Sequence, residues 1–156
     1  MLAAGASSRY GGVKQRDLLP SVLAALRETS VDEVLVVEGA HPLEAPGARL
    51  VHCAQWERGP GASLRCGLEA LGTDVGRAVI VLADGPALDP RAVDRVAAHG
   101  APVAAASYDG TRSHPFALDR TLWPEVPDEG GRALEPELVD CSDLRPPGDV
   151  DVRPPA

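Results

Sequence analysis

The feature that most constrains the fold is an unbroken apolar run at residues 78–82, Ala-Val-Ile-Val-Leu. A strand with one face in solvent alternates apolar and polar residues, whereas a strand covered on both faces is apolar throughout. The run therefore predicts a buried strand of a parallel sheet. It is followed by Ala-Asp-Gly-Pro at residues 83–86, so the carboxylate of Asp84 stands at the carboxyl end of that strand.

The rest of the chain alternates short apolar runs with helical periodicity. We expect strands near residues 1–3, 34–37, 50–51 and 103–107. We expect helices at 17–26, 64–71, from Asp89 onward and at 118–123, with Asp17 and Asp89 as N-caps and an irregular segment after Cys141. This alternation predicts one α/β domain over residues 1–156, with helices on both faces of a mostly parallel sheet.

Composition excludes some classes of function. A net charge of −8 disfavours a protein that grips nucleic acid through many phosphates. No apolar run approaches the ~20 residues that span a bilayer, and no charged segment followed by an apolar one opens the sequence, so we expect no signal peptide. Cysteines at 53, 66 and 141 form no CxxC pair, so we expect reduced, buried thiols in a cytoplasmic protein.

A segment rich in small residues follows the first predicted strand, from Leu2 to Lys14. Small residues allow backbone N–H groups to surround an anion, and Arg9 and Lys14 would add positive charge. Lys14 is the only lysine among 15 basic residues, and composition alone leaves two explanations: chance or a codon bias towards Arg, and the need for a compact charge beside phosphate. The segment is neither a Walker A loop nor a GxGxxG motif. A flexible surface loop is the alternative.

The spacing LAAGxSxRxGxxK resembles the signature of the MobA-like nucleotidyltransferases, the family of molybdenum cofactor cytidylyl- and guanylyltransferases. The resemblance implies a three-layer, Rossmann-like fold of the GT-A type. It also implies that the loop wraps a nucleoside triphosphate whose phosphates contact Arg9 and Lys14. The loop residues expected to bind nucleotide are Leu2, Ala3, Ala4, Gly5, Ser7, Arg9, Gly11 and Lys14.

A second match lies at residues 56–68, WERGPGASLRCGL, which is similar to the family stretch W-x-x-G-x-x-x-S-L-x-x-G-L. The resemblance assigns Gly59 and Ser63 to the nucleotide pocket. Taken alone, Ser63 is more typical of a helix cap than of a ligand contact.

Two acidic segments match the family's metal-binding motifs. Residues 82–86 look like LADxP, and a carboxylate at the carboxyl end of a parallel strand lies on the ligand side of such sheets. Burial of Asp84 without a partner would be costly, which favours a metal such as Mg²⁺ over a turn cap. Residues 148–151 resemble D-[IV]-D, so Asp149 and Asp151 are the other candidate ligands. A solvated acidic tail remains the alternative there.

Two further segments imply a binding site for the acceptor. Residues 113–116, Ser-His-Pro-Phe, resemble G-H-P-x, and residues 128–132, Asp-Glu-Gly-Gly-Arg, resemble D-x-G-x-R of the molybdenum cofactor transferases. The resemblance places His114, Asp128 and Arg132 against the acceptor. In isolation His114 is as typical of a turn, and Arg132 could pair with an acceptor phosphate or with Asp128.

The chain departs from the family pattern at several positions. In relatives the first strand runs several residues before Leu2, and a longer loop separates Lys14 from Asp17. Cys53 stands where relatives often carry Asn, and Val152 with Arg153 replaces the usual Thr. We therefore expect a domain whose first strand and acceptor loop are shortened.

The resemblance implies Mg²⁺-dependent nucleotidyl transfer. The phosphate of molybdopterin attacks the α-phosphorus of CTP, or of GTP as second choice, and pyrophosphate leaves. Lys14, Arg9 and Asp84 are the expected catalytic residues, and a molybdoenzyme or its chaperone is an expected protein partner. The alternatives are a sugar-1-phosphate or isoprenoid-phosphate nucleotidyltransferase, and a degenerate nucleotide-binding protein without turnover.

Overall fold

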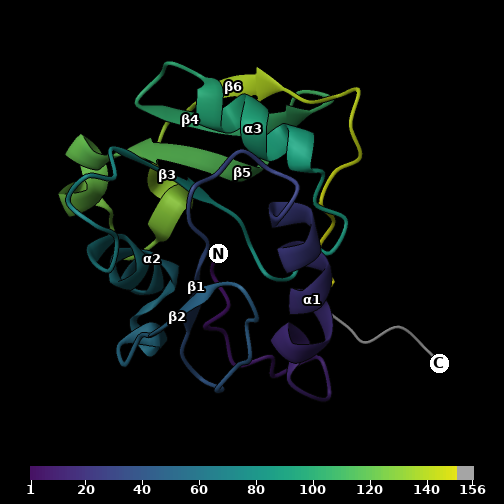
Figure 1. Cartoon of the computed structure of the whole chain (residues 1–156), viewed down its shortest axis with the longest axis vertical. Helices are drawn as coiled ribbons and strands as arrows, with labels where there is room; N and C mark the ends of the chain where they lie inside the picture. Colours follow the sequence, from purple (N-terminus) through teal and green to yellow (C-terminus); the bar gives the residue numbers. More distant parts are fainter. Residues whose placement is uncertain (151–156) are drawn as a thin grey trace.

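The structure, a computed structural model, describes residues 1–150 and is built from helices and strands that alternate along the chain (Figure 1). No helix in that part of the chain combines the length and the apolar character needed to cross a membrane. The helices are α1 (Lys14–Leu26), α2 (Pro60–Glu69) and α3 (Pro90–Ala98). The strands are β1 (Leu35–Glu38), β2 (Arg49–His52), β3 (Arg77–Ile80), β4 (Val103–Tyr108), β5 (Thr111–Asp119) and β6 (Glu137–Asp140). Short 3₁₀ helices are η1 (Trp56–Arg58), η2 (Arg120–Glu125) and η3 (Gly130–Ala133).

The strands form two hydrogen-bonded groups that one residue connects. β1 and β2 pair in parallel, and the other group has the order β3-β5-β4-β6. Leu2 lies between the groups and forms parallel bridges with Val37 and with Leu82. Its N–H donates to the carbonyl of Val81 (2.9 Å), and its own carbonyl accepts from the N–H of Ala83 (3.0 Å). The first residues of the chain therefore link both parts of the sheet.

The sheet is mixed, so the prediction of a mostly parallel sheet is wrong. β3 and β4 both pair antiparallel with β5, which the sequence reasoning had not identified as a strand. The cause is a hairpin between β4 and β5, whose turn residues Asp109 and Gly110 both have positive φ, 51° and 78°. An Asp-Gly pair between two strands favours this turn. The helix expected at 118–123 begins later than predicted. Leu118 still belongs to β5, and the 3₁₀ helix η2 starts at Arg120.

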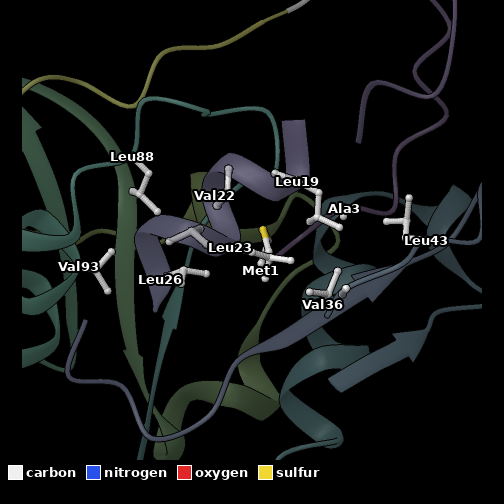
Figure 2. Close-up of a cluster of buried hydrophobic side chains, with 13 residues drawn as sticks. Met1, Ala3, Leu19, Val22, Leu23, Leu26, Val36, Leu43, Leu88 and Val93 are labelled. Carbon is white, nitrogen blue, oxygen red and sulfur yellow. The ribbon is translucent and has the colours of Figure 1, made fainter. Parts of the chain in front are cut away.

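Helices cover both faces of the sheet, as predicted. Side chains alternate along each strand, so Val81 packs with α1 and α3 on one face, while the neighbouring Ile80 packs with α2 and η2 on the other. Figure 2 shows the first of these cores, where the apolar face of α1 lies against Met1 and Val36. The α1 side chains drawn in Figure 2 are Leu19, Val22, Leu23 and Leu26.

The two predicted N-caps have different outcomes. Asp89 caps α3, where its side chain accepts a hydrogen bond from the N–H of Arg91 (2.9 Å). Asp17 does not cap α1, because that helix begins earlier, at Lys14. The hydroxyl of Ser7 accepts a hydrogen bond from the N–H of Lys14 (3.2 Å). The loop that precedes α1 (residues 4–13, the glycine-rich loop below) therefore supplies a partner for the first turn of the helix.

The prediction of three reduced thiols is wrong for two of them. Cys53 and Cys66 form a disulfide with a Cα–Cα distance of 5.8 Å, and Cys141 is free and buried. The bridge joins the residue after β2 to the second turn of α2. Their separation of 13 residues carries no pairing signal, because only the packing of α2 against the ends of the strands brings the two side chains together.

An apolar groove of about 290 Å³ lies between β1 and β3, and Met1 is among the residues that line it. Residues from both strands line it, together with side chains of α2 such as Leu64 and Leu68. The α-ammonium of Met1 donates to the carbonyl of Leu35 (2.7 Å) at this position, and burial lowers its pKa to about 5. Figure 1 places the N terminus in the middle of the molecule, between β1 and β3.

Candidate active site

A pocket of about 610 Å³ lies between the first residues of the chain, the segment that follows β3, and η1 with the start of α2. It gathers most of the residues that the sequence motifs singled out. Its lining includes Leu2, Ala3, Ala4, Gly5, Ser7, Arg9, Lys14, Gly59, Ser63, Asp84, Arg132 and Asp149. Three predicted site residues, Gly11, His114 and Asp128, do not line it. Asp151 lies outside the described residues.

The glycine-rich loop is held in shape by Gln15, a buried residue that the sequence reasoning missed. Its side-chain amide donates to the carbonyl of Gly5 (2.9 Å), and its Oε1 accepts from the hydroxyl of Ser7 (2.5 Å). Ser7 has a φ of 55°, a left-handed conformation that is uncommon outside glycine. A polar residue at the first turn of a helix was the available signal, and only the folded loop shows what it binds.

Lys14 lies between two carboxylates. Its Nζ is 3.1 Å from Oδ2 of Asp84 and 3.8 Å from Oδ1 of Asp149. The side chain of Lys14 is only 11% exposed, against 31% for Asp84 and 68% for Asp149. Motifs separated by more than sixty residues in the sequence thus meet at one point of the pocket.

Backbone hydrogen bonds tie the tail that carries Asp149 to the segment that carries Asp84. The N–H of Val150 donates to the carbonyl of Asp84 (3.2 Å), and the N–H of Ala87 donates to the carbonyl of Pro147 (3.0 Å). The two carboxylates are therefore positioned by main-chain contacts as well as by the ammonium between them.

This donor set fits a divalent cation that arrives with a phosphate ligand. Mg²⁺ typically takes one or two carboxylates and completes its octahedron with water and phosphate oxygens. Asp84 and Asp149 supply the two carboxylates. Within residues 1–150 no group of three or more His, Cys, Asp or Glu side chains could hold a metal by itself. The arrangement thus suits a shared metal and nucleotide site better than a closed protein cage.

Helix α2 presents its N terminus to the same pocket. Gly59, with a φ of 124°, is its N-cap, so the interpretation of Ser63 as a cap is wrong; Ser63 is a buried residue of the helix that lines the pocket. Gly61 allows the helix to approach a neighbouring loop, because its N–H donates to the carbonyl of Asp128 (2.9 Å). A Cβ at Gly61 would lie 1.8 Å from the carbonyl oxygen of Pro127.

His114 lies behind the pocket. Its ring is buried in β5 against Gly85, where an added Cβ would come within 2.6 Å of the imidazole. Neither ring nitrogen has a hydrogen-bond partner. Burial lowers the pKa of His114 to about 4, although the negative charge of Asp84 opposes the shift. The imidazole is therefore neutral at physiological pH and supports the turn that follows Asp84.

Asp128 and Arg132 have different surroundings in the structure. The Asp128 carboxylate pairs with Arg65, and with Arg58 at 3.4 Å, and the hydrogen bond from Arg65 holds its pKa below the usual range. Arg132 instead lines the pocket. The predicted alternative, in which Arg132 pairs with Asp128, is therefore not the arrangement that the structure shows.

Trp56 and Glu57 extend the pocket beyond the predicted residues. The indole packs over the end of β1, where a Cβ at Gly39 would come within 2.6 Å of the Trp56 side chain. The sequence signal for Trp56 was its place at the start of the motif at residues 56–68. Only Gly59 and Ser63 of that motif had been predicted to line the nucleotide pocket.

Comparison with known proteins agrees with this geometry. Residues 1–135 match the family model of the MobA-like NTP transferase domain. No curated protein matches the sequence. Rv0371c from Mycobacterium tuberculosis is 27% identical and superimposes with a TM-score of 0.75, covering 97% of this chain and 90% of that one. A second structure of Rv0371c, in complex with manganese, is 25% identical with a TM-score of 0.67, covering 89% and 85%.

Two further structures share the fold. The Rv0371c homologue of Mycobacterium sp. strain JC1 has a TM-score of 0.80 at 24% identity, covering 97% of this chain and 88% of that one. The 2-C-methyl-D-erythritol 4-phosphate cytidylyltransferase of Thermus thermophilus has a TM-score of 0.62 at 21% identity, covering 89% and 86%. The match over residues 1–135, together with the pocket built from the same motifs, shows that the chain belongs to the MobA-like NTP transferase family and is a nucleotidyltransferase.

Proposed function

We propose that this nucleotidyltransferase uses Mg²⁺ to transfer a nucleoside monophosphate from CTP, or less readily from GTP, to the phosphate of a molybdopterin-type acceptor. Pyrophosphate is the second product. The observation that carries the proposal is the position of Lys14 beside Asp84 and Asp149 in a pocket bounded by the glycine-rich loop. A pocket of about 610 Å³ lies within the usual range for ligand sites.

The chemistry consists largely of positioning and of charge stabilisation. Arg9 and the backbone of the loop hold the leaving pyrophosphate. Lys14 pairs with the α-phosphoryl oxygens, whose negative charge grows as the acceptor oxygen attacks in line. Asp84 and Asp149 would hold the metal, which supplies further charge neutralisation at the phosphates. A structure of Rv0371c in complex with manganese supports the use of a divalent ion.

The acceptor enters from the side on which Arg132 lines the pocket. The guanidinium is suited to pair with the acceptor's phosphate, since its planar donors match phosphate oxygens. His114 and Asp128 act indirectly in this proposal. His114 supports the turn at Gly85, and Asp128 supports the N terminus of α2 through its contact with Gly61.

A test combines four nucleoside triphosphates with three acceptors: molybdopterin, a sugar 1-phosphate and an isoprenoid-type phosphate. Release of pyrophosphate is measured with Mg²⁺ present. We expect turnover with CTP and molybdopterin, and a Lys14→Met variant slower by about 10²–10³-fold. Arg27→Met is the matched control, because Arg27 lies at the opposite end of α1, where its side chain donates a hydrogen bond to the carbonyl of Pro46 (2.8 Å).

Each other result has a distinct meaning. Turnover with another phosphate acceptor keeps the nucleotidyl transfer and rejects molybdopterin as the acceptor. Binding of CTP without pyrophosphate release with any acceptor would favour a nucleotide-binding protein that has lost turnover.

A further inference from the structure

We propose that Lys14 acts as a built-in competitor of the metal. In the nucleotide-free protein its ammonium occupies the place between the two carboxylates, so a divalent ion binds tightly only together with a nucleoside triphosphate. This inference rests on the proposed function, because it uses the same two carboxylates as metal ligands.

The first step of the argument is geometric. The Lys14 ammonium is within 3.1 Å of one Asp84 oxygen and within 3.8 Å of one Asp149 oxygen. A divalent ion bound to both carboxylates needs oxygens that face the same space. The Lys14 side chain is only 11% exposed, so the ammonium is enclosed at this position and does not extend into solvent. The cation and the lysine therefore cannot both use these oxygens fully.

The second step concerns charge. Asp84, Asp149 and the Lys14 ammonium together carry a charge of −1, whereas the two carboxylates alone carry −2, so the ammonium removes part of the attraction for an incoming ion. A divalent ion that enters beside an undisplaced ammonium is also repelled by it at a few ångströms, where charges interact strongly in a partly buried site. Both effects weaken binding of the metal alone.

The third step concerns the displaced ammonium. Lys14 is the first residue of α1, and its N–H is already held by Ser7 of the glycine-rich loop. Its backbone is thus anchored, while the flexible four-carbon stem can turn the ammonium toward phosphate oxygens inside the same pocket. A bound triphosphate supplies those oxygens. It therefore draws Lys14 away from Asp84 and Asp149 and contributes its own metal ligands at the same time.

The consequence is a coupling between two ligands. If nucleotide raises the affinity for metal, metal must raise the affinity for nucleotide by the same factor. The protein then takes up metal and triphosphate as a unit and does not hold a metal in the absence of nucleotide. A lysine that served only as a structural ion pair would stay in place and would produce no such coupling.

The experiment measures binding of Mn²⁺ alone to the purified full chain by the loss of the free-ion signal in electron paramagnetic resonance. It is run on the wild type, Lys14→Met, Lys14→Gln and the control Arg27→Met. We expect both Lys14 variants to bind Mn²⁺ at least tenfold more tightly than the wild type, and Arg27→Met to differ by less than about twofold. Lys14 and Arg27 are near opposite ends of a 13-residue helix, so the control carries the same change in charge about 20 Å away.

A second measurement adds CTP at saturation. We expect CTP to tighten Mn²⁺ binding in the wild type and to have a much smaller effect in Lys14→Gln. The inference is overturned if folded Lys14 variants, checked by circular dichroism, bind Mn²⁺ alone no more tightly than the wild type. Failure of the proposed function looks different, because the wild type would then bind no triphosphate or would release no pyrophosphate, whatever the Mn²⁺ affinities.

Discussion

Replacement of His114 by leucine isolates the effect of one buried imidazole on the acid stability of the protein. The ring packs against Gly85 inside the sheet, and neither nitrogen is hydrogen-bonded. Leucine has a similar size and removes two unpaired polar atoms. At about pH 7.5 we therefore expect the free energy of unfolding of His114→Leu to lie within about 1 kcal/mol of the wild type.

The difference grows as the pH falls. Burial lowers the pKa of His114 from 6.5 to about 4, so between these values the unfolded chain binds the proton more strongly than the folded protein does. The stabilisation is complete above the unfolded pKa and is lost as the pH falls toward the folded one. Linkage with these two pKa values gives a loss of about 2.5 kcal/mol at about pH 4.5.

Urea denaturation at a series of pH values from about 7.5 to 4.5 measures this loss, with circular dichroism as the signal. Other carboxylates titrate in the same interval, but their contribution is shared by both proteins and cancels in the difference. The wild type should lose about 2.5 kcal/mol more than His114→Leu over this interval. Parallel stability curves for the two proteins would refute the reasoning, because they would mean that the folded state tolerates a charged imidazole at this site.

Three further substitutions test the packing. Gly61→Ala places a Cβ 1.8 Å from the Pro127 carbonyl and should lower the unfolding free energy by about 1–3 kcal/mol, whereas Gly76→Ala, with no atom within 4 Å, should change little in the same urea titration. Loss of the disulfide in Cys66→Ala should cost about 3 kcal/mol through the entropy of a loop of this length, measured against wild type that has been kept oxidised; equal stability would contradict it. Leu118→Ala removes a fully buried side chain and should cost about 2–5 kcal/mol, and a cost below 1 kcal/mol would show that the core collapses around the gap.

Local signals predicted much of the fold. The N-cap at Asp89 was predicted because a cap depends on neighbours in sequence. The apolar run at residues 78–82 indicated a strand, but β3 spans Arg77–Ile80 and pairs antiparallel with β5, which the run alone could not show. The strand β5 was missed, although Asp109 and Gly110 carried the hairpin signal. The start of α1 was placed too late because the partner of its first turn, Ser7, comes from the preceding loop.

The site residues that could be predicted from the sequence are those that belong to a recognisable motif. Lys14 and Asp84 were singled out from different segments, and the structure brings them to 3.1 Å. Gln15 was missed because its role is a set of hydrogen bonds to loop atoms that no spacing reveals. The pairing of Cys53 with Cys66 was missed for the same reason, since it depends on how α2 packs against the strands.

The apolar groove between β1 and β3 has a practical consequence for anyone who wishes to label or immobilise this protein. A label coupled to the nitrogen of Met1 would start at this groove, because Met1 lines it and its nitrogen is buried against the carbonyl of Leu35. A fluorophore or a surface linker is better placed on the exposed turn at Thr73.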